Sequence, residues 1–188
     1  AAERTRLLET LVADPAARGR GTMVVFNDEV HAARYVTKSM SHNPATFRSP
    51  DWGPMGRFFG QRLRWGWPLT QEPLPMARLE SDVHLLRVTV GSDPLLLRVL
   101  VERRVAGIVI EGVGANRVPP DWLPLIRQAT DQGTTVVVAR GTAAGHTGDG
   151  YGYEGAARTL AAAGAQLAEG LDGRKARLRL MVTLGPRR

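Results

Sequence analysis

The sequence predicts an α/β protein, and the clearest evidence is a regular alternation of strands and helices in its second half. Short runs rich in β-branched residues, which suit buried strands, are expected at 83–90, 107–110 and 134–139. Segments of helical periodicity separate them at 94–104 and 119–132. Strands that alternate with helices pair in parallel through right-handed crossovers. We therefore expect a small open sheet whose functional loops lie at the carboxyl ends of its strands.

The helices of this half have recognisable ends and faces. The second ends before Gly133, because glycine closes helices readily. A last helix is expected at 174–184, after a loop at 141–155 that is rich in Gly and Thr. The first helix is expected to pack four apolar side chains on the sheet: Leu95, Leu96, Val99 and Leu100.

The first half also mixes helix and strand. An amphipathic helix is expected at 3–13, and an apolar strand at 23–26 runs into the turn formers Asn27 and Asp28. A second extended piece then leads from residue 29 to Lys38. No strand precedes the helix, so we expect the chain to begin within a larger fold, with residues 23–26 at the open edge of a parallel sheet.

Residues 60–68 alternate Leu and Trp with Arg and Gly, a period of two that predicts an edge strand with one packed face. A proline-containing stretch at 69–82 follows and is expected to be a linker. These features predict a first domain at 1–68 and a second domain at 83–188.

Composition argues against nucleic-acid and membrane partners. The net charge is +7, but the basic residues are nearly all Arg and are spread among acids, which is typical of a solvated basic surface. No apolar run is long enough to cross a bilayer, and no signal peptide is expected. The chain has no cysteine, which fits the cytoplasm.

No cofactor is expected. The four histidines show no spacing that suits a metal site, and His31 is expected to be packed and hydrogen-bonded. The segment GVGANR lacks the glycine spacing of a dinucleotide fingerprint, and no P-loop lysine follows it.

Several motifs occur together in a recognisable order: FNDEVHAARYVTKS, ATFRSPDWGPMG, GIVIEGVGANRVPP and LDGRKARLRLMVTLG. Together they resemble the bacterial L-asparaginase (asparaginase/glutaminase) family. The resemblance implies a two-domain fold, here with an incomplete N-terminal α/β domain followed by a Rossmann/flavodoxin-like parallel-sheet domain. It also implies that the chain corresponds to the later half of such an enzyme, and that it assembles as a homo-oligomer.

The resemblance identifies Lys38 as the catalytic lysine of the VTK motif. The residues alone favour a surface lysine that closes a strand, and the surrounding motif reverses that interpretation. In the family this lysine acts with a threonine and an aspartate from TGGT-like and DGTD-like turns, and neither turn occurs in this sequence. Because losing a catalytic nucleophile costs about 10⁶-fold in rate, we expect the chain alone to be inactive.

For substrate binding, the resemblance implies Asn116, or Ala115 one residue earlier, and Glu154. The alternative for Asn116 is a loop that turns tightly at its glycines. The predicted function is hydrolysis of L-asparagine to L-aspartate and ammonia through an acyl-threonine, without a metal and with a complementary N-terminal half. The alternative is an inactive homologue that serves as an interaction or binding module.

Overall fold

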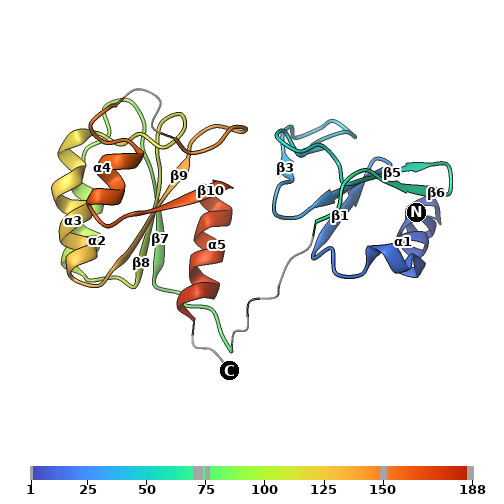
Figure 1. The fold of residues 1–188 in the computed structure, drawn as a ribbon, viewed down its shortest axis with the longest axis horizontal. Helices are drawn as coiled ribbons and strands as arrows, with labels where there is room; N and C mark the ends of the chain where they lie inside the picture. The colour runs from blue at the N-terminus through green and yellow to red at the C-terminus, as the bar shows by residue number, and fades with distance from the viewer. Residues whose placement is uncertain (1, 70–73, 75–76, 149–151, 186–188) are drawn as a thin grey trace. The chain divides into compact units, whose positions relative to one another are not determined.

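The computed structural model describes most of the chain, namely residues 2–69, 74, 77–148 and 152–185. The chain divides into two compact units, Ala1–Pro73 and Leu74–Arg188 (Figure 1). The expected linker at 69–82 spans this division, but its residues 70–73 and 75–76 lie outside the described part. None of the helices in the described ranges is long and apolar enough to cross a membrane.

The first unit contains an antiparallel sheet in the order β1-β2-β5-β6. The strands are Met23–Phe26 (β1), Glu29–Ala32 (β2), Gly56–Phe59 (β5) and Arg62–Trp65 (β6). The expected parallel pairing is therefore wrong for this unit. The reason lies at Asn27 and Asp28, whose φ angles of 49° and 57° form a two-residue hairpin turn that reverses the chain.

The two edges of this sheet match the sequence pattern. All four residues of β1 are partly exposed, so within the described residues this edge strand borders open apolar surface. On β6, at the other edge, Leu63 and Trp65 are half-buried while Arg62 and Arg64 are exposed. The predicted edge strand with one packed face is confirmed.

Helix α1, Ala2–Ala13, and a short 3₁₀ turn η1, Pro15–Ala17, precede this sheet. Asp14 joins them to β6, because the indole N–H of Trp65 donates to its carboxylate at 2.8 Å. The same carboxylate accepts from the backbone N–H of Ala16 at 2.9 Å. These two hydrogen bonds, that from Trp65 being the stronger cause, lower the pKa of Asp14.

The second unit contains the expected parallel sheet, in the order β10-β9-β8-β7. Its strands are Val83–Arg87 (β7), Gly107–Glu111 (β8), Thr135–Arg140 (β9) and Gln166–Asp172 (β10). Residues 166–172 were not expected to form a strand. They pair with β9 at the edge of the sheet.

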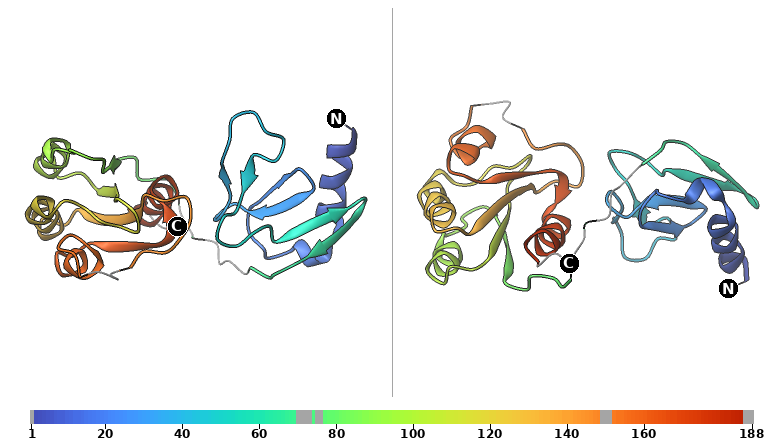
Figure 2. Two further views of the ribbon diagram at one scale, coloured as in Figure 1. Left: turned by 90° about the horizontal axis from the view of Figure 1, so that it is seen from above. Right: turned by 60° about the horizontal axis from the view of Figure 1, so that its bottom comes forward.

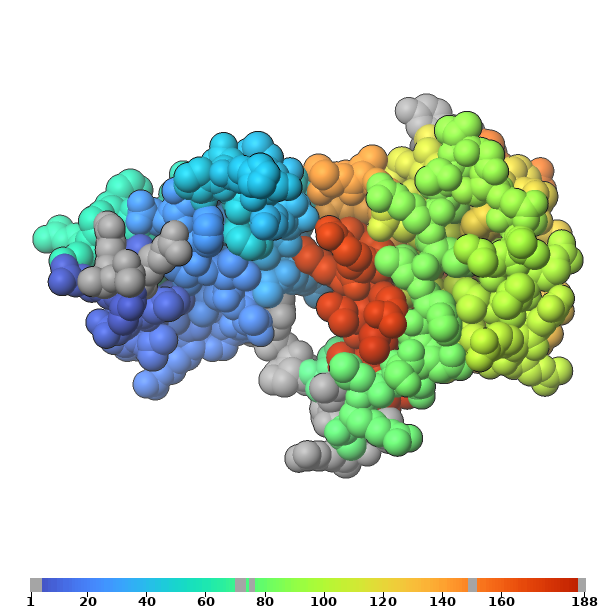
Figure 3. All heavy atoms as spheres, turned by 180° about the vertical axis from the view of Figure 1, so that it is seen from behind, coloured from blue at the N-terminus to red at the C-terminus, as the bar shows by residue number. Residues whose placement is uncertain are grey.

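Helices cover both faces of this sheet (Figures 1 and 2). One face carries α2 (Leu95–Glu102), η2 (Pro120–Trp122), α3 (Leu123–Asp131) and α4 (Ala157–Ala162), and the other carries α5 (Gly173–Leu184). Ala176 and Leu180 of α5 are buried against the strands, as predicted. The outer side of α5, red in Figure 3, contributes to the surface of this unit, and its Leu178 is exposed.

The packed face of α2 differs from the expected one. Leu97 is fully buried, whereas Leu95, Leu96 and Val99 are 60%, 64% and 41% exposed. Of the four side chains predicted to point inward, Leu100 alone packs partly against the core. The helix is apolar on nearly every side, so helical periodicity did not distinguish the face that meets α3 and the sheet.

Candidate functional site

Lys38 lies on a small hairpin of its own, separate from the main sheet of the first unit. Strand β3, Thr37–Lys38, pairs with β4, Phe47–Arg48, so that Lys38 is opposite Phe47. The Lys38 side chain is exposed. Within the described residues, no hydroxyl or carboxylate forms a hydrogen bond or ion pair with its amine. A cation in this position is free to meet a group supplied from elsewhere.

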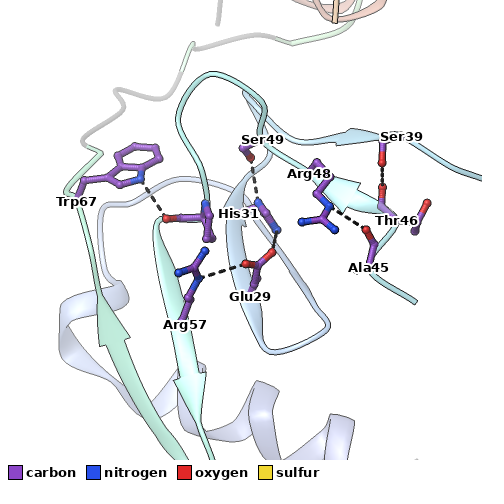
Figure 4. Close-up of polar contacts among 10 residues, drawn as sticks. Glu29, His31, Ser39, Ala45, Thr46, Arg48, Ser49, Arg57 and Trp67 are labelled. Atoms are coloured by element: carbon purple, nitrogen blue, oxygen red, sulfur yellow. Dashed lines mark hydrogen bonds and ion pairs between the residues drawn. The ribbon is translucent and has the colours of Figure 1, made fainter. Parts of the chain in front are cut away.

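The residues around Lys38 are held by short-range hydrogen bonds. The Ser39 backbone N–H and hydroxyl both donate to the carbonyl of Thr46, at 2.8 and 2.9 Å. Arg48 Nε donates to the carbonyl of Ala45 at 3.1 Å (Figure 4). The ring of Phe47 meets Phe26 of β1 edge to face, with ring centroids 5.1 Å apart. Most of the contacts are thus local.

A buried polar chain runs beside this hairpin (Figure 4). His31 of β2 is 1% exposed, and its Nδ1 is 3.0 Å from Ser49 Oγ. Its Nε2 is 3.2 Å from the Glu29 carboxylate, which also pairs with Arg57 at 3.2 Å. The prediction of a packed, hydrogen-bonded His31 is confirmed. No sequence pattern predicts its partner Ser49, 18 residues away.

The second candidate region is the loop after β8. Val113 and Arg117 pair across it through two backbone hydrogen bonds of 2.7 and 2.9 Å. Asn116 between them is fully buried. In the amide orientation that gives both of its polar atoms a partner, the side chain donates to the carbonyl of Gly148 at 2.9 Å and accepts from the backbone N–H of Ala157 at 3.1 Å. Ala115, the alternative position, is partly exposed.

Glu154 lies on the segment that follows β9 and is exposed. Its neighbour Tyr153 lines an open groove of about 660 Å³ at the carboxyl ends of β7 and β8. Val90, Val113 and Arg117 also line this groove. Asn116 forms hydrogen bonds with Gly148 and Ala157, which lie on either side of Glu154 in the sequence. The structure therefore brings the two predicted substrate-binding segments together. Lys38 belongs to the other unit.

A cluster of charged residues at the start of α5 was not predicted from the sequence. Asp172 caps α5 by accepting from the backbone N–H of Lys175 at 3.0 Å. Burial lowers the pKa of Lys175; the Asp172 carboxylate opposes this shift, and the Arg140 and Arg174 guanidiniums reinforce it. Arg140, at the end of β9, is 6% exposed and donates to the carbonyl of Gly145 at 2.8 Å. This cluster ties the start of the loop after β9 to the sheet.

Comparison with known proteins covers both units. Residues 82–188 match the Glutaminase/Asparaginase C-terminal domain, and residues 8–71 match the N-terminal asparaginase domain. The L-asparaginase of Bacillus licheniformis is 33% identical over 177 residues, which are 90% of this chain and 53% of that protein. A probable L-asparaginase of Deinococcus radiodurans is 37% identical over 177 residues, with the same two shares.

L-asparaginase 2 of Escherichia coli is 30% identical over 132 residues, which are 66% of this chain and 38% of that protein. The chain thus spans about half the length of the first two relatives. Both domain models match in the order expected from the sequence motifs, and one of them covers more than half of the chain. This chain belongs to the glutaminase/asparaginase family.

Proposed function

We propose that this chain forms part of an L-asparaginase-type amidohydrolase, which converts L-asparagine and water to L-aspartate and ammonia. Lys38 is its catalytic residue in this proposal. The observation that supports this proposal most directly is the exposed Lys38 amine. Among the described residues this amine has no polar partner, although the backbone of the hairpin around it is hydrogen-bonded. The names of the relatives support the same reaction class.

The chemistry needs a hydroxyl and a carboxylate beside this amine. A threonine hydroxyl attacks the amide carbon once its proton can leave and the developing charge is stabilised. The C–N bond then breaks, ammonia departs with the transferred proton, and water cleaves the resulting threonine ester. In this proposal the Lys38 amine stabilises the developing charge and helps to pass the threonine proton to the departing ammonia. The 188 residues contain no TGGT- or DGTD-like turn, so these groups come from another stretch of polypeptide.

For substrate binding, we propose the segments that contain Asn116 and Glu154. The Glu154 carboxylate is exposed and suits the α-amino group of an amino acid. Asn116 is buried, so its contribution is to hold the loop in which Ala115 is partly exposed. The proposal includes a homo-oligomer, in which these segments serve a neighbouring copy, and a location in the cytoplasm.

The test mixes the chain with a second polypeptide that carries the TGGT- and DGTD-like turns of a relative and measures ammonia release from L-asparagine. We expect activity in the mixture and none from either part alone. Lys38→Ala should lower kcat by at least about 10³-fold, as expected for a group that acts on the reacting atoms. Lys38→Arg should recover little, since a guanidinium keeps its proton.

The matched control is Arg62→Ala, which removes an exposed cation from β6 with the same change in net charge. It should leave kcat within twofold. Equal activity of the Lys38→Ala and unmodified mixtures would refute the catalytic assignment of Lys38.

A second candidate is a catalytically inactive, ligand-binding module. The groove beside Tyr153 favours it, because its lining residues are mostly apolar and include one arginine, one tyrosine and one threonine, a composition typical of small-molecule sites. Binding of L-aspartate by the chain alone, lost in Tyr153→Ala, would support this candidate if no mixture releases ammonia.

A further inference from the structure

The hairpin of Lys38 has little intrinsic stability. Strands β3 and β4 are two residues each and form a separate two-stranded sheet. An isolated pair of this length is marginal in water, so its position depends on side chains that connect it to the rest of the unit. The Phe26–Phe47 ring contact is one such connection.

Ser49 provides a further connection, and it lies directly after β4. Its carbonyl accepts from the backbone N–H groups of Trp52 and Gly53, at 3.3 and 2.8 Å, which starts the following turn. Its hydroxyl is 3.0 Å from His31 Nδ1 on β2. Ser49 is 5% exposed, so water does not compete for this contact. The hairpin is thus joined to the main sheet where β4 ends.

We propose that His31 is a positioning residue for Lys38: through Ser49 it fixes the β3–β4 hairpin against β2 and so sets where the Lys38 amine lies. The catalytic consequence rests on the proposed function, whereas the structural link does not. His31 itself touches no reacting atom in this proposal. It acts through a chain of Ser49, β4 and the Lys38–Phe47 pair.

The direction of the His31–Ser49 bond follows from Glu29. The carboxylate lies 3.2 Å from Nε2 but off the direction of a hydrogen bond, and its negative charge favours the proton on that nitrogen. Nδ1 is then the acceptor, and the Ser49 hydroxyl donates to it. The other charged groups near the imidazole are Arg48 and Arg57, which disfavour a second proton, as burial does. The neutral ring therefore holds Ser49 in one orientation.

Hydrogen–deuterium exchange of the full 188-residue chain tests the link without any catalytic readout. Ser49→Ala should raise amide exchange in residues 37–48 about fivefold, the size expected for losing one buried hydrogen bond. Exchange in β1 and in β8 should not change. The control Ser41→Ala removes an exposed hydroxyl from the same loop and should have no effect.

Two substitutions at His31 distinguish the roles of its two ring nitrogens. His31→Asn keeps a polar atom near the Nδ1 position and should stay close to the unmodified chain. His31→Gln places its amide near the Nε2 position and should behave like Ser49→Ala. Equal exchange in these two variants, no change in Ser49→Ala, or a rise that extends equally over β1 and β2 would each overturn the proposal.

In the complemented mixture, Ser49→Ala should lower kcat about tenfold and leave KM within twofold, because the amine is displaced and the substrate-binding segments are untouched. His31→Asn should restore most of the rate. If no mixture is active, the proposed function fails, and the exchange experiment still decides whether His31 positions the hairpin.

Discussion

The side-chain amide of Asn116 donates a 2.9 Å hydrogen bond to the carbonyl oxygen of Gly148. With the bond from the Ala157 N–H, it joins the loop after β8 to both ends of the segment that contains Glu154. Asn116 is fully buried, so its side-chain amide depends on these two bonds for its hydrogen-bond partners, whereas Gly148 is exposed.

We therefore expect Asn116→Ala to lower the free energy of unfolding of the second unit by about 2–3 kcal/mol, since two backbone groups lose a buried partner. Asn116→Asp should cost more, because a carboxylate cannot donate to Gly148. Urea denaturation followed by circular dichroism measures both. Unchanged stability with a raised KM in the complemented mixture would instead identify Asn116 as a direct substrate ligand.

The same two loops approach too closely for a side chain at Gly141. A Cβ atom there would lie 2.1 Å from the carbonyl oxygen of Gly112, a backbone atom that cannot move aside. Gly141→Ala should therefore destabilise the second unit by about 3 kcal/mol. Gly148→Ala is the matched control, because a Cβ at Gly148 meets nothing within 4 Å. Similar melting temperatures for the two variants would contradict this packing.

The stability of the first unit should depend on pH through His31. Burial lowers the pKa of His31 from its ordinary 6.5, although Glu29 opposes the shift. Below pH 6.5 the unfolded chain then binds a proton more readily than the folded chain, so stability falls as the pH drops below about 6.5. His31→Asn should flatten this part of the profile. The control is His42→Asn, which replaces an exposed histidine of the same unit and should keep the slope; denaturation midpoints from pH 5 to 7.5 compare the two variants.

Local signals in the sequence predicted much of the fold. Asn27 and Asp28 were recognised as turn formers, and Gly133, with φ of 90°, closes the helix before β9. Strand β10 escaped prediction because 166–172, QLAEGLD, has no β-branched residue and carries Gly170. It is a strand because β9 offers an edge to pair with. That information is tertiary and has no local signature.

The candidate site, like the fold, could be predicted only in part from the sequence. Lys38, Asn116 and Glu154 were selected through motifs, but their exposure depends on segments distant in sequence. Asn116 is buried by residues more than 30 positions later, and His31 meets Ser49 across a loop. The family resemblance of the motifs selected Lys38, Asn116 and Glu154, whereas only the fold shows that Asn116 faces inward and Lys38 outward.

Helix α2 offers the sharpest test of the fold, because adjacent leucines differ in burial. Leu97 is fully buried in the core, and Leu96 is 64% exposed. Leu97→Ala should lower the free energy of unfolding of the second unit by about 3 kcal/mol, from lost burial and the cavity left behind. Leu96→Ala should change it by less than about 0.5 kcal/mol. The two substitutions remove the same atoms from the same helix turn. The difference between their urea midpoints therefore measures how much burial of the leucine side chain contributes to the free energy of unfolding. If Leu96→Ala proved the costlier change, α2 would pack through the face that the sequence pattern first suggested.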